Sequence, residues 1–167
     1  MGSMKYGFYV LTVAVVVLDH ATKWLVRTQL GADRAIEIVP GYLRIAYVGN
    51  TGVAFGLFRD LESPWKPYVL AAMAVAAVAF ILVYSVRTPG NRLLLQVALA
   101  VTMGGIIGNF IDRVARGFVV DFIEFHIEDT FHWPTFNVAD SAISVGIAML
   151  LLDTLKNPER GEGAQSR

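Results

Sequence analysis

The residues with the clearest chemical potential in this sequence are two aspartates, Asp121 and Asp140, which lie nineteen positions apart. Each stands where an apolar chain should enter or leave a lipid bilayer, and an ionised side chain at the bilayer centre costs about 2.5–3.5 kcal/mol. Two carboxylates within hydrogen-bonding reach do not both ionise easily, so they share a proton. One can then act as a base toward water while the other acts as an acid toward a carbonyl, which is the chemistry of aspartic peptide hydrolysis.

The same residues also have structural interpretations. Asp140 opens the last apolar stretch and Asp121 lies in the loop after the third, so packing of these two helix ends would bring both carboxylates to one side of a membrane. Asp140 alone would also suit the first turn of a helix, where an acid interacts with the helix dipole. Asn137 alone would suit a helix N-cap. The spacing therefore permits a dyad without requiring one.

The composition indicates that membrane helices must position these residues. Of 167 residues, 55% are hydrophobic and only 17% are charged, and the mean hydropathy is +0.54, which is typical of a membrane protein. The net charge of zero gives no argument for a nucleic-acid partner. The absence of cysteine excludes disulfides, thiolate metal sites and cysteine nucleophiles.

Four apolar stretches, 6–25, 67–86, 93–111 and 138–155, are each about long enough to cross a bilayer. We therefore predict an all-α membrane protein, a four-transmembrane-helix bundle forming a single domain over 1–167. The first stretch carries Asp19, His20 and Lys23 in place of a small-residue cleavage site, so we expect it to be retained. We interpret residues 1–3 as a cloning remnant and expect the charged tail, 157–167, to be disordered.

The long connection, 26–66, is predicted to be extracytoplasmic and to contain a small β-hairpin. Apolar residues alternate with other residues on both sides of a Pro40-Gly41 turn, and the apolar ones are Ile36, Ile38, Leu43, Ile45 and Tyr47. Their common face could lie on lipid or cradle a peptide. The short segments at both termini and between the second and third stretches are densest in Lys and Arg, which predicts cytoplasmic termini. Three tryptophans fit an interfacial belt on the outer side: Trp24, Trp65 and Trp133.

Other polar groups and glycines suggest local roles. Asp19 and Lys23 lie four residues apart on one helix face and can neutralise each other. Gly104 and Gly108 suit close helix packing, with Asn109 and Arg113 on a face below them. The segment Asn50-Thr51-Gly52 is, by itself, only a turn signal.

Together, five ordered blocks resemble the lipoprotein signal peptidases (signal peptidase II), a bacterial family of aspartic intramembrane peptidases with four membrane helices. The blocks are Asp19-His20-Ala21-Thr22-Lys23, Asn50-Thr51-Gly52-Val53-Ala54-Phe55, Gly108-Asn109 with Asp112-Arg113, Val120-Asp121-Phe122 and Phe136-Asn137-Val138-Ala139-Asp140. They span nearly the whole chain. Two positions depart from the family pattern, because His20 replaces the usual glutamine and Val53 replaces a common alanine.

The resemblance implies that Asp121 and Asp140 are the catalytic dyad, with no metal and no cofactor. It implies substrate-binding or supporting roles for eight further residues: Asp19, Lys23, Asn50, Gly52, Asn109, Asp112, Arg113 and Asn137. The substrate would be a diacylglyceryl-modified prolipoprotein, cleaved just before the lipidated cysteine. The resemblance also implies a protein of the bacterial cytoplasmic (inner) membrane, an active site near its extracytoplasmic face, and cyclic peptide antibiotics as inhibitors. We expect a monomer, because one chain carries both aspartates.

Three alternatives start from other residues. Ser141 and Lys23 could form a serine-lysine dyad. A small polar-solute or ion transporter would also place carboxylates within apolar helices. A zinc hydrolase is the weakest alternative, because His20, His126 and His132 fall in no recognisable ligand spacing. We interpret His126 and His132 as solvated loop residues.

Overall fold

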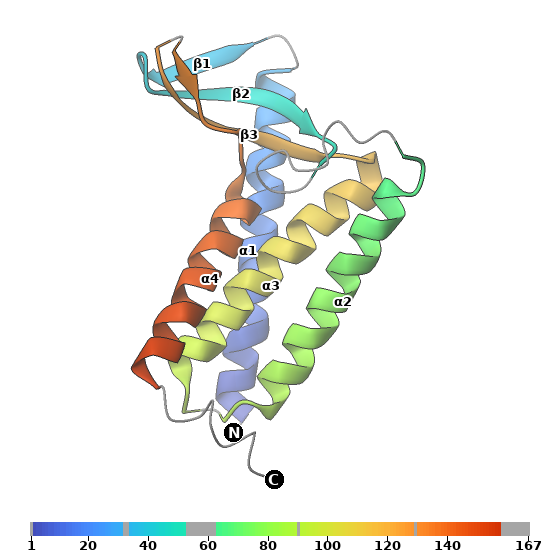
Figure 1. Ribbon diagram of the computed structural model, residues 1–167, viewed down its shortest axis with the longest axis vertical. Helices are drawn as coiled ribbons and strands as arrows, with labels where there is room; N and C mark the ends of the chain where they lie inside the picture. The colour runs from blue at the N-terminus through green and yellow to red at the C-terminus, as the bar shows by residue number, and fades with distance from the viewer. Residues whose placement is uncertain (1, 32–33, 53–62, 90, 129, 158–167) are drawn as a thin grey trace.

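Four long helices form the body of the protein. The computed structural model describes residues 2–31, 34–52, 63–89, 91–128 and 130–157, so Val53 and nearly all of the predicted disordered tail lie outside the described residues. The helices are α1 (Gly2–Gln29), α2 (Lys66–Arg87), α3 (Leu93–Arg116) and α4 (Val138–Lys156). Each is long and apolar enough to cross a membrane, as their hydropathy predicts. They run alternately up and down, so that α1 begins and α4 ends at the same end of the bundle (Figure 1).

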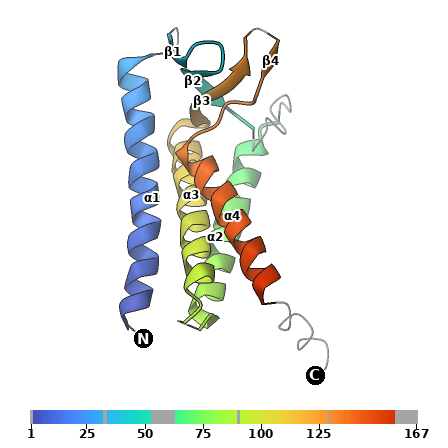
Figure 2. The ribbon, with the colours of Figure 1, turned by 90° about the vertical axis from the view of Figure 1, so that its left-hand side faces the viewer.

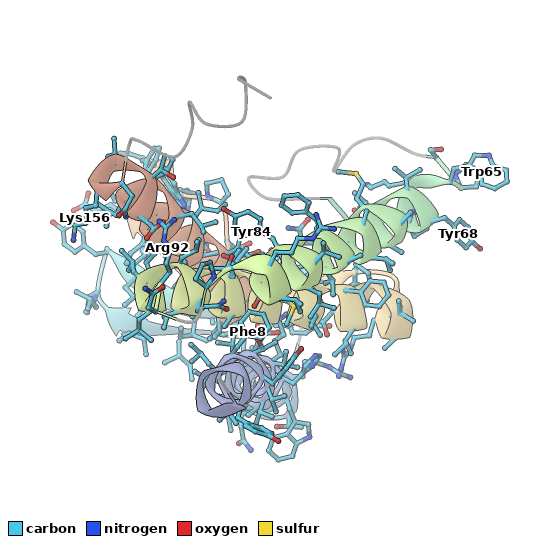
Figure 3. All side chains as sticks on the ribbon, turned by 90° about the horizontal axis from the view of Figure 1, so that it is seen from below. Phe8, Trp65, Tyr68, Tyr84, Arg92 and Lys156 are labelled. Atoms are coloured by element: carbon cyan, nitrogen blue, oxygen red, sulfur yellow. The ribbon has the colours of Figure 1, made fainter. Side chains whose placement is uncertain are left out.

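Helix α3 is the central helix and packs against the other three (Figure 2). In its apolar span 61% of the residues are buried, compared with 11–22% in the other helices. Phe8 of α1 joins a buried cluster with Ile81 of α2 and with Leu95, Leu99 and Met103 of α3. Figure 3 shows Phe8 between α1 and α3, whereas Trp65 and Tyr68 at the start of α2 point away from the bundle.

Two glycines of α3 allow α1 to approach closely, as predicted. A Cβ atom on Gly104 would lie 2.7 Å from the Cβ atom of Val15, and a Cβ atom on Gly108 would lie 2.6 Å from Oδ2 of Asp19. A side chain at Gly104 would push the two helices apart, and one at Gly108 would displace the carboxylate of Asp19. The glycines therefore bring the polar end of α1 into contact with α3.

An antiparallel sheet in the order β1-β2-β3-β4 covers one end of the bundle (Figure 1). Its strands are β1 (Ala35–Val39), β2 (Leu43–Asn50), β3 (Val119–Ile127) and β4 (Phe131–His132). Strands β1 and β2 pair as the antiparallel hairpin that the sequence predicts, and this hairpin is part of a larger sheet. The other edge of β2 pairs with β3. The segment between α3 and α4 therefore supplies two of the four strands, β3 and β4.

The prediction that Asp121 lies in a loop is wrong. Helix α3 continues to Arg116 and ends at Gly117, whose positive φ of 80° suits glycine. Strand β3 then begins at Val119 and carries Asp121. The β-branched and aromatic residues beside Asp121 favour a strand once β2 offers an unpaired edge.

One face of the sheet is apolar and open. Ile36, Ile38, Phe125 and Ile127 are each 49–55% exposed. Ile36 and Ile45 are direct cross-strand neighbours on this face. The predicted apolar hairpin face is therefore present, and β3 extends it.

His126 and His132 lie in strands, and not in loops as the sequence analysis expects. His132 is solvated, as expected, with its side chain 44% exposed, whereas His126 is buried. His126 is buried in β3 and stacks on His132 of β4 with ring centroids 5.7 Å apart. His126 lies 3.3 Å from a carboxylate oxygen of Glu37, and His132 lies 2.8 Å from one of Glu124. The sheet thereby brings Glu37 next to His126, although these two residues are far apart in sequence.

Candidate active site

Asp121 lies on β3 and is completely buried. Its Oδ2 accepts a hydrogen bond of 2.8 Å from Nδ2 of Asn50, the last residue of β2. Its Oδ1 accepts a hydrogen bond of 2.7 Å from Nδ2 of Asn137. Two side-chain amides from different elements therefore orient this carboxylate.

Asp140 lies in the first turn of α4 and forms a capping box with Asn137. The Asp140 N–H donates to Oδ1 of Asn137 at 2.9 Å, and the Asn137 N–H donates to Oδ2 of Asp140 at 3.3 Å. Asn109 of α3 donates to Oδ1 of Asp140 at 2.7 Å. The structural interpretations of Asn137 as an N-cap and of Asp140 as a helix-terminal acid are both confirmed, and neither conflicts with a role in chemistry.

Asn137 and Asn109 connect the two carboxylates. Asn137 is completely buried, and its Nδ2 group lies within hydrogen-bonding distance of both Asp121 and Oδ1 of Asn109. The amide of Asn109 then continues to Asp140. Such a buried polar network, with its members paired, holds its parts in one arrangement.

The electrostatic environment favours a proton on Asp121. Burial, reinforced by the negative charge of Asp140, raises the pKa of Asp121 to about 7. Hydrogen bonds from Asn50 and Asn137 and the positive charge of Lys23 act in the opposite direction. A carboxyl group in this state can donate a proton near neutral pH, which is what a catalytic acid requires.

Lys23 and two further carboxylates form a second buried cluster beside the first. The expected ion pair with Asp19 is present, at 2.7 Å, and Lys23 also lies 2.9 Å from Asp112. All three side chains are at most 1% exposed. Arg116 forms an ion pair with Asp112, so two positive and two negative charges offset one another.

Arg113 fastens the end of β2 to α3. Its Nη2 group donates to the backbone carbonyl of Gly52 at 2.9 Å, and its Nη1 group donates to that of Asn109 at 3.3 Å. The Gly52 N–H donates to Oδ1 of Asn50 at 2.8 Å, which is the turn that the sequence predicts. The amide group of Asn50 can therefore point its Nδ2 at Asp121.

The structure does not favour the serine-lysine alternative. Ser141 donates its hydroxyl group to the carbonyl of Asn137 at 3.0 Å. Lys23 is instead bound to Asp19, Asp112 and Asn109. In the part of the chain that the structure describes, no three His, Cys, Asp or Glu side chains are arranged to hold a metal ion.

Hydrogen bonds and ion pairs connect all ten residues that the sequence analysis proposes for the site. Gly52 takes part through its backbone only. Sequence reasoning missed Arg116 and the backbone amides of Val120 and Ala139. The four-residue spacing between Asp112 and Arg116 is a signal that could have identified the ion pair. The amides carry no sequence signal, because only the fold shows that Asp112 and Asp19 accept their hydrogen bonds.

Comparisons with known proteins agree with this geometry. The family model described as "Signal peptidase (SPase) II" matches residues 11–156. A lipoprotein signal peptidase of Symbiobacterium thermophilum is 44% identical over 153 residues, covering 91% of this chain and 96% of the relative. One of Pseudomonas fluorescens is 38% identical over 158 residues, covering 95% and 92%.

Two solved bacterial membrane enzymes also share the fold. One, determined at 2.3 Å by the in meso method, has a TM-score of 0.80 and 27% identity, covering 96% of this chain and 93% of its own. The other, determined at 1.9 Å, has a TM-score of 0.78 and 30% identity, covering 90% and 94%. On these matches, this chain belongs to the signal peptidase II family.

Proposed function

We propose that this protein removes the signal peptide from diacylglyceryl-modified prolipoproteins, cutting just before the lipidated cysteine with Asp121 and Asp140 as an aspartic dyad. The family assignment supports lipoprotein signal peptide cleavage. The observation that carries the catalytic assignment is the pair of carboxylates joined through Asn137 and Asn109. The raised pKa of Asp121 supports a shared proton.

The proposed reaction needs one proton on the pair. The ionised carboxylate takes a proton from water, and the water oxygen attacks the scissile carbonyl carbon. The protonated carboxyl group donates its proton to the carbonyl oxygen. Collapse of the tetrahedral intermediate breaks the C–N bond, and the proton taken from water passes to the leaving amine. One hydroxyl group of the intermediate returns its proton to the other carboxylate, which leaves a carboxylic acid product and restores the singly protonated pair. We assign the proton to the pair, because coupled carboxyl groups titrate together.

The remaining residues have supporting roles in this proposal. Amide donors from Asn50, Asn109 and Asn137 orient the carboxylates. Arg113 holds the end of β2 through the Gly52 carbonyl. The buried ion-pair cluster of Asp19, Lys23 and Asp112 lies next to the dyad and supports it.

The protein is a multi-pass protein of the bacterial inner membrane in this proposal, with cytoplasmic termini and the sheet on the extracytoplasmic side. The basic residues Arg87, Arg92 and Lys156 at the end opposite the sheet support this orientation. The exposed Trp24 and Trp65 fit an interfacial belt at the end that carries the sheet. One chain supplies both aspartates, which supports a monomer. The apolar sheet face would cradle or cover the signal segment, and cyclic peptide antibiotics would compete at the same site.

The decisive experiment is cleavage of a diacylglyceryl-modified prolipoprotein peptide by the purified protein in detergent with a chelator present. Asp121→Asn and Asp140→Asn should each abolish cleavage while the protein stays folded. The wild type should be unaffected by the chelator. Cleavage that survives in a folded Asp121→Asn variant would refute the dyad.

A transporter remains the alternative from another class. The comparisons give it no support, because the matched family and relatives are peptidases. Solute flux into liposomes containing the wild-type protein would test it directly. Flux that stops in Asp121→Asn, without any peptide cleavage by the wild type, would favour transport.

A further inference from the structure

Lys23 is a buried ammonium group with a complete set of acceptors. Its side chain is 1% exposed, and Nζ lies 2.7 Å from Asp19, 2.9 Å from Asp112 and 3.0 Å from Oδ1 of Asn109. A protonated lysine has three N–H donors, and these three acceptors can use all of them. Lys23 therefore has no donor left for a substrate and can act only through its partners.

The first partner holds the start of α4. Asp19 accepts the backbone N–H of Ala139 at 3.0 Å through its second oxygen, Oδ1. Ala139 immediately precedes Asp140 in the first turn of the helix. The position of Asp19 therefore constrains the backbone that carries this carboxylate.

The second partner holds β3 in the same way. Asp112 accepts the backbone N–H of Val120 at 3.2 Å, and Val120 immediately precedes Asp121. The other oxygen of Asp112 pairs with Arg116. Each of the two carboxylates bound to Lys23 thus also binds the amide just before one of the two dyad aspartates.

Lys23 fixes the orientation of its third partner, the side-chain amide of Asn109. An ammonium group only donates, so the oxygen of the Asn109 amide must face it. The NH₂ group of Asn109 must then point the other way, toward Oδ1 of Asp140, to which it donates at 2.7 Å. A flipped amide would lose both interactions.

We propose that Lys23 is the positioning residue of the dyad. Through Asp19 and Asp112 it fixes the separation of the two backbone segments that carry the aspartates, and through Asn109 it orients a donor to one of them. This inference rests on the proposed function. It goes beyond a general supporting role, because it assigns the spacing of two non-adjacent elements to one ammonium group.

The test needs a variant that removes the ammonium without leaving an unbalanced charge. The pair Asp19→Asn with Lys23→Met removes one positive and one negative charge, and an asparagine oxygen can still accept the Ala139 N–H. The matched control is Arg92→Met with Asp153→Asn. This second ion pair joins α4 to the residue before α3 at the opposite end of the bundle, and its removal changes the charge in the same way.

Melting temperature, KM and kcat are measured for both paired variants with the diacylglyceryl-modified peptide. We expect both to fold and to keep KM within about threefold of the wild type. The Asp19→Asn/Lys23→Met variant should lose about 100-fold in kcat, which is the effect of a misplacement near 1 Å. The control should keep its kcat within about threefold, since it does not contact the dyad network.

A folded Asp19→Asn/Lys23→Met variant with wild-type kcat would overturn the inference. Lys23→Arg provides a second test, because it keeps the charge but replaces a compact ammonium with a planar fork. It should lower kcat by at least about tenfold with little change in KM, and an unchanged kcat would also overturn the inference. Asp121→Asn is assayed in parallel, since cleavage surviving there refutes the proposed function itself.

Discussion

Asn137 donates a hydrogen bond of 2.7 Å from its Nδ2 group to Oδ1 of Asp121, although the two residues lie on different elements. The other end of the same amide, Oδ1, accepts the backbone N–H of Asp140 and so caps α4. Helix capping and support of Asp121 therefore use different atoms of one side chain. A suitable substitution can separate them.

Asn137→Ser should separate these two roles. Serine is an equally good N-cap, but it lacks the amide donor that lowers the pKa of Asp121. We expect kcat to fall about tenfold, as on loss of a positioned hydrogen bond to a charged group, and the upper pH limit of cleavage to move upward. Measurements of kcat against pH check this. Asn157→Ser, at the far end of α4, is the control, and an unchanged pH profile would contradict the prediction.

The wild-type enzyme should lose activity above neutral pH. Because the pKa of Asp121 is raised to about 7, the pair holds its proton below that pH and loses it above. With a single essential proton, kcat should fall by about tenfold per pH unit well above pH 7. Initial rates between pH 5 and 9 test this. A rate that stays constant up to pH 9 would show that no carboxyl proton of this pKa is needed.

The sequence is sufficient to predict the helices and to identify Asp121 and Asp140 as candidate site residues. Helices of this length need only a long apolar run, and Asp121 and Asp140 interrupt an apolar chain at a cost that makes them candidates for a functional role. The Asn137 cap and the Asp19–Lys23 pair follow from local spacing rules. Each of these predictions uses either residues within about one helical turn of each other or the thickness and low polarity of the bilayer.

The remaining features depend on contacts between distant segments. Asp121 looks like a loop residue until the β2 edge, about 70 residues earlier, is available for pairing. Asp112 appears to end an apolar stretch, yet the structure buries it against Lys23 on another helix. His126 was assigned to solvent for the same reason. Local periodicity carries no information about such partners.

Gly104→Ala should destabilise the bundle, because the added Cβ would lie 2.7 Å from the Cβ of Val15 and 2.9 Å from a backbone oxygen. Overpacking of this kind typically costs about 1–3 kcal/mol. Gly7→Ala is the matched control, since nothing lies within 4 Å of a Cβ there, and it should be neutral or stabilising. Thermal unfolding in detergent distinguishes the two. Equal melting temperatures would show that α1 adjusts without cost.

Glu124→Gln should weaken the sheet in a pH-dependent manner. Glu124 accepts two hydrogen bonds of 2.9 Å from Arg44 and lies 2.8 Å from Nδ1 of His132. Burial alone would raise the pKa of Glu124, but Arg44 and His132 together lower it. A carboxylate with a lowered pKa stabilises the fold above its unfolded pKa of about 4.3 and loses that contribution as the pH falls through its lower folded value.

The melting temperature of Glu124→Gln should therefore lie a few degrees below the wild type at pH 7, and the difference should shrink below about pH 4. The cleavage rate at a permissive temperature should change by less than about threefold, because Glu124 makes no contact with the dyad network. Glu128→Gln, which removes the same charge from an exposed turn residue just after β3, is the control and should show no such pH dependence. A difference in melting temperature that is the same at pH 7 and pH 4 would mean that shape, and not the charge of the carboxylate, accounts for the stabilisation.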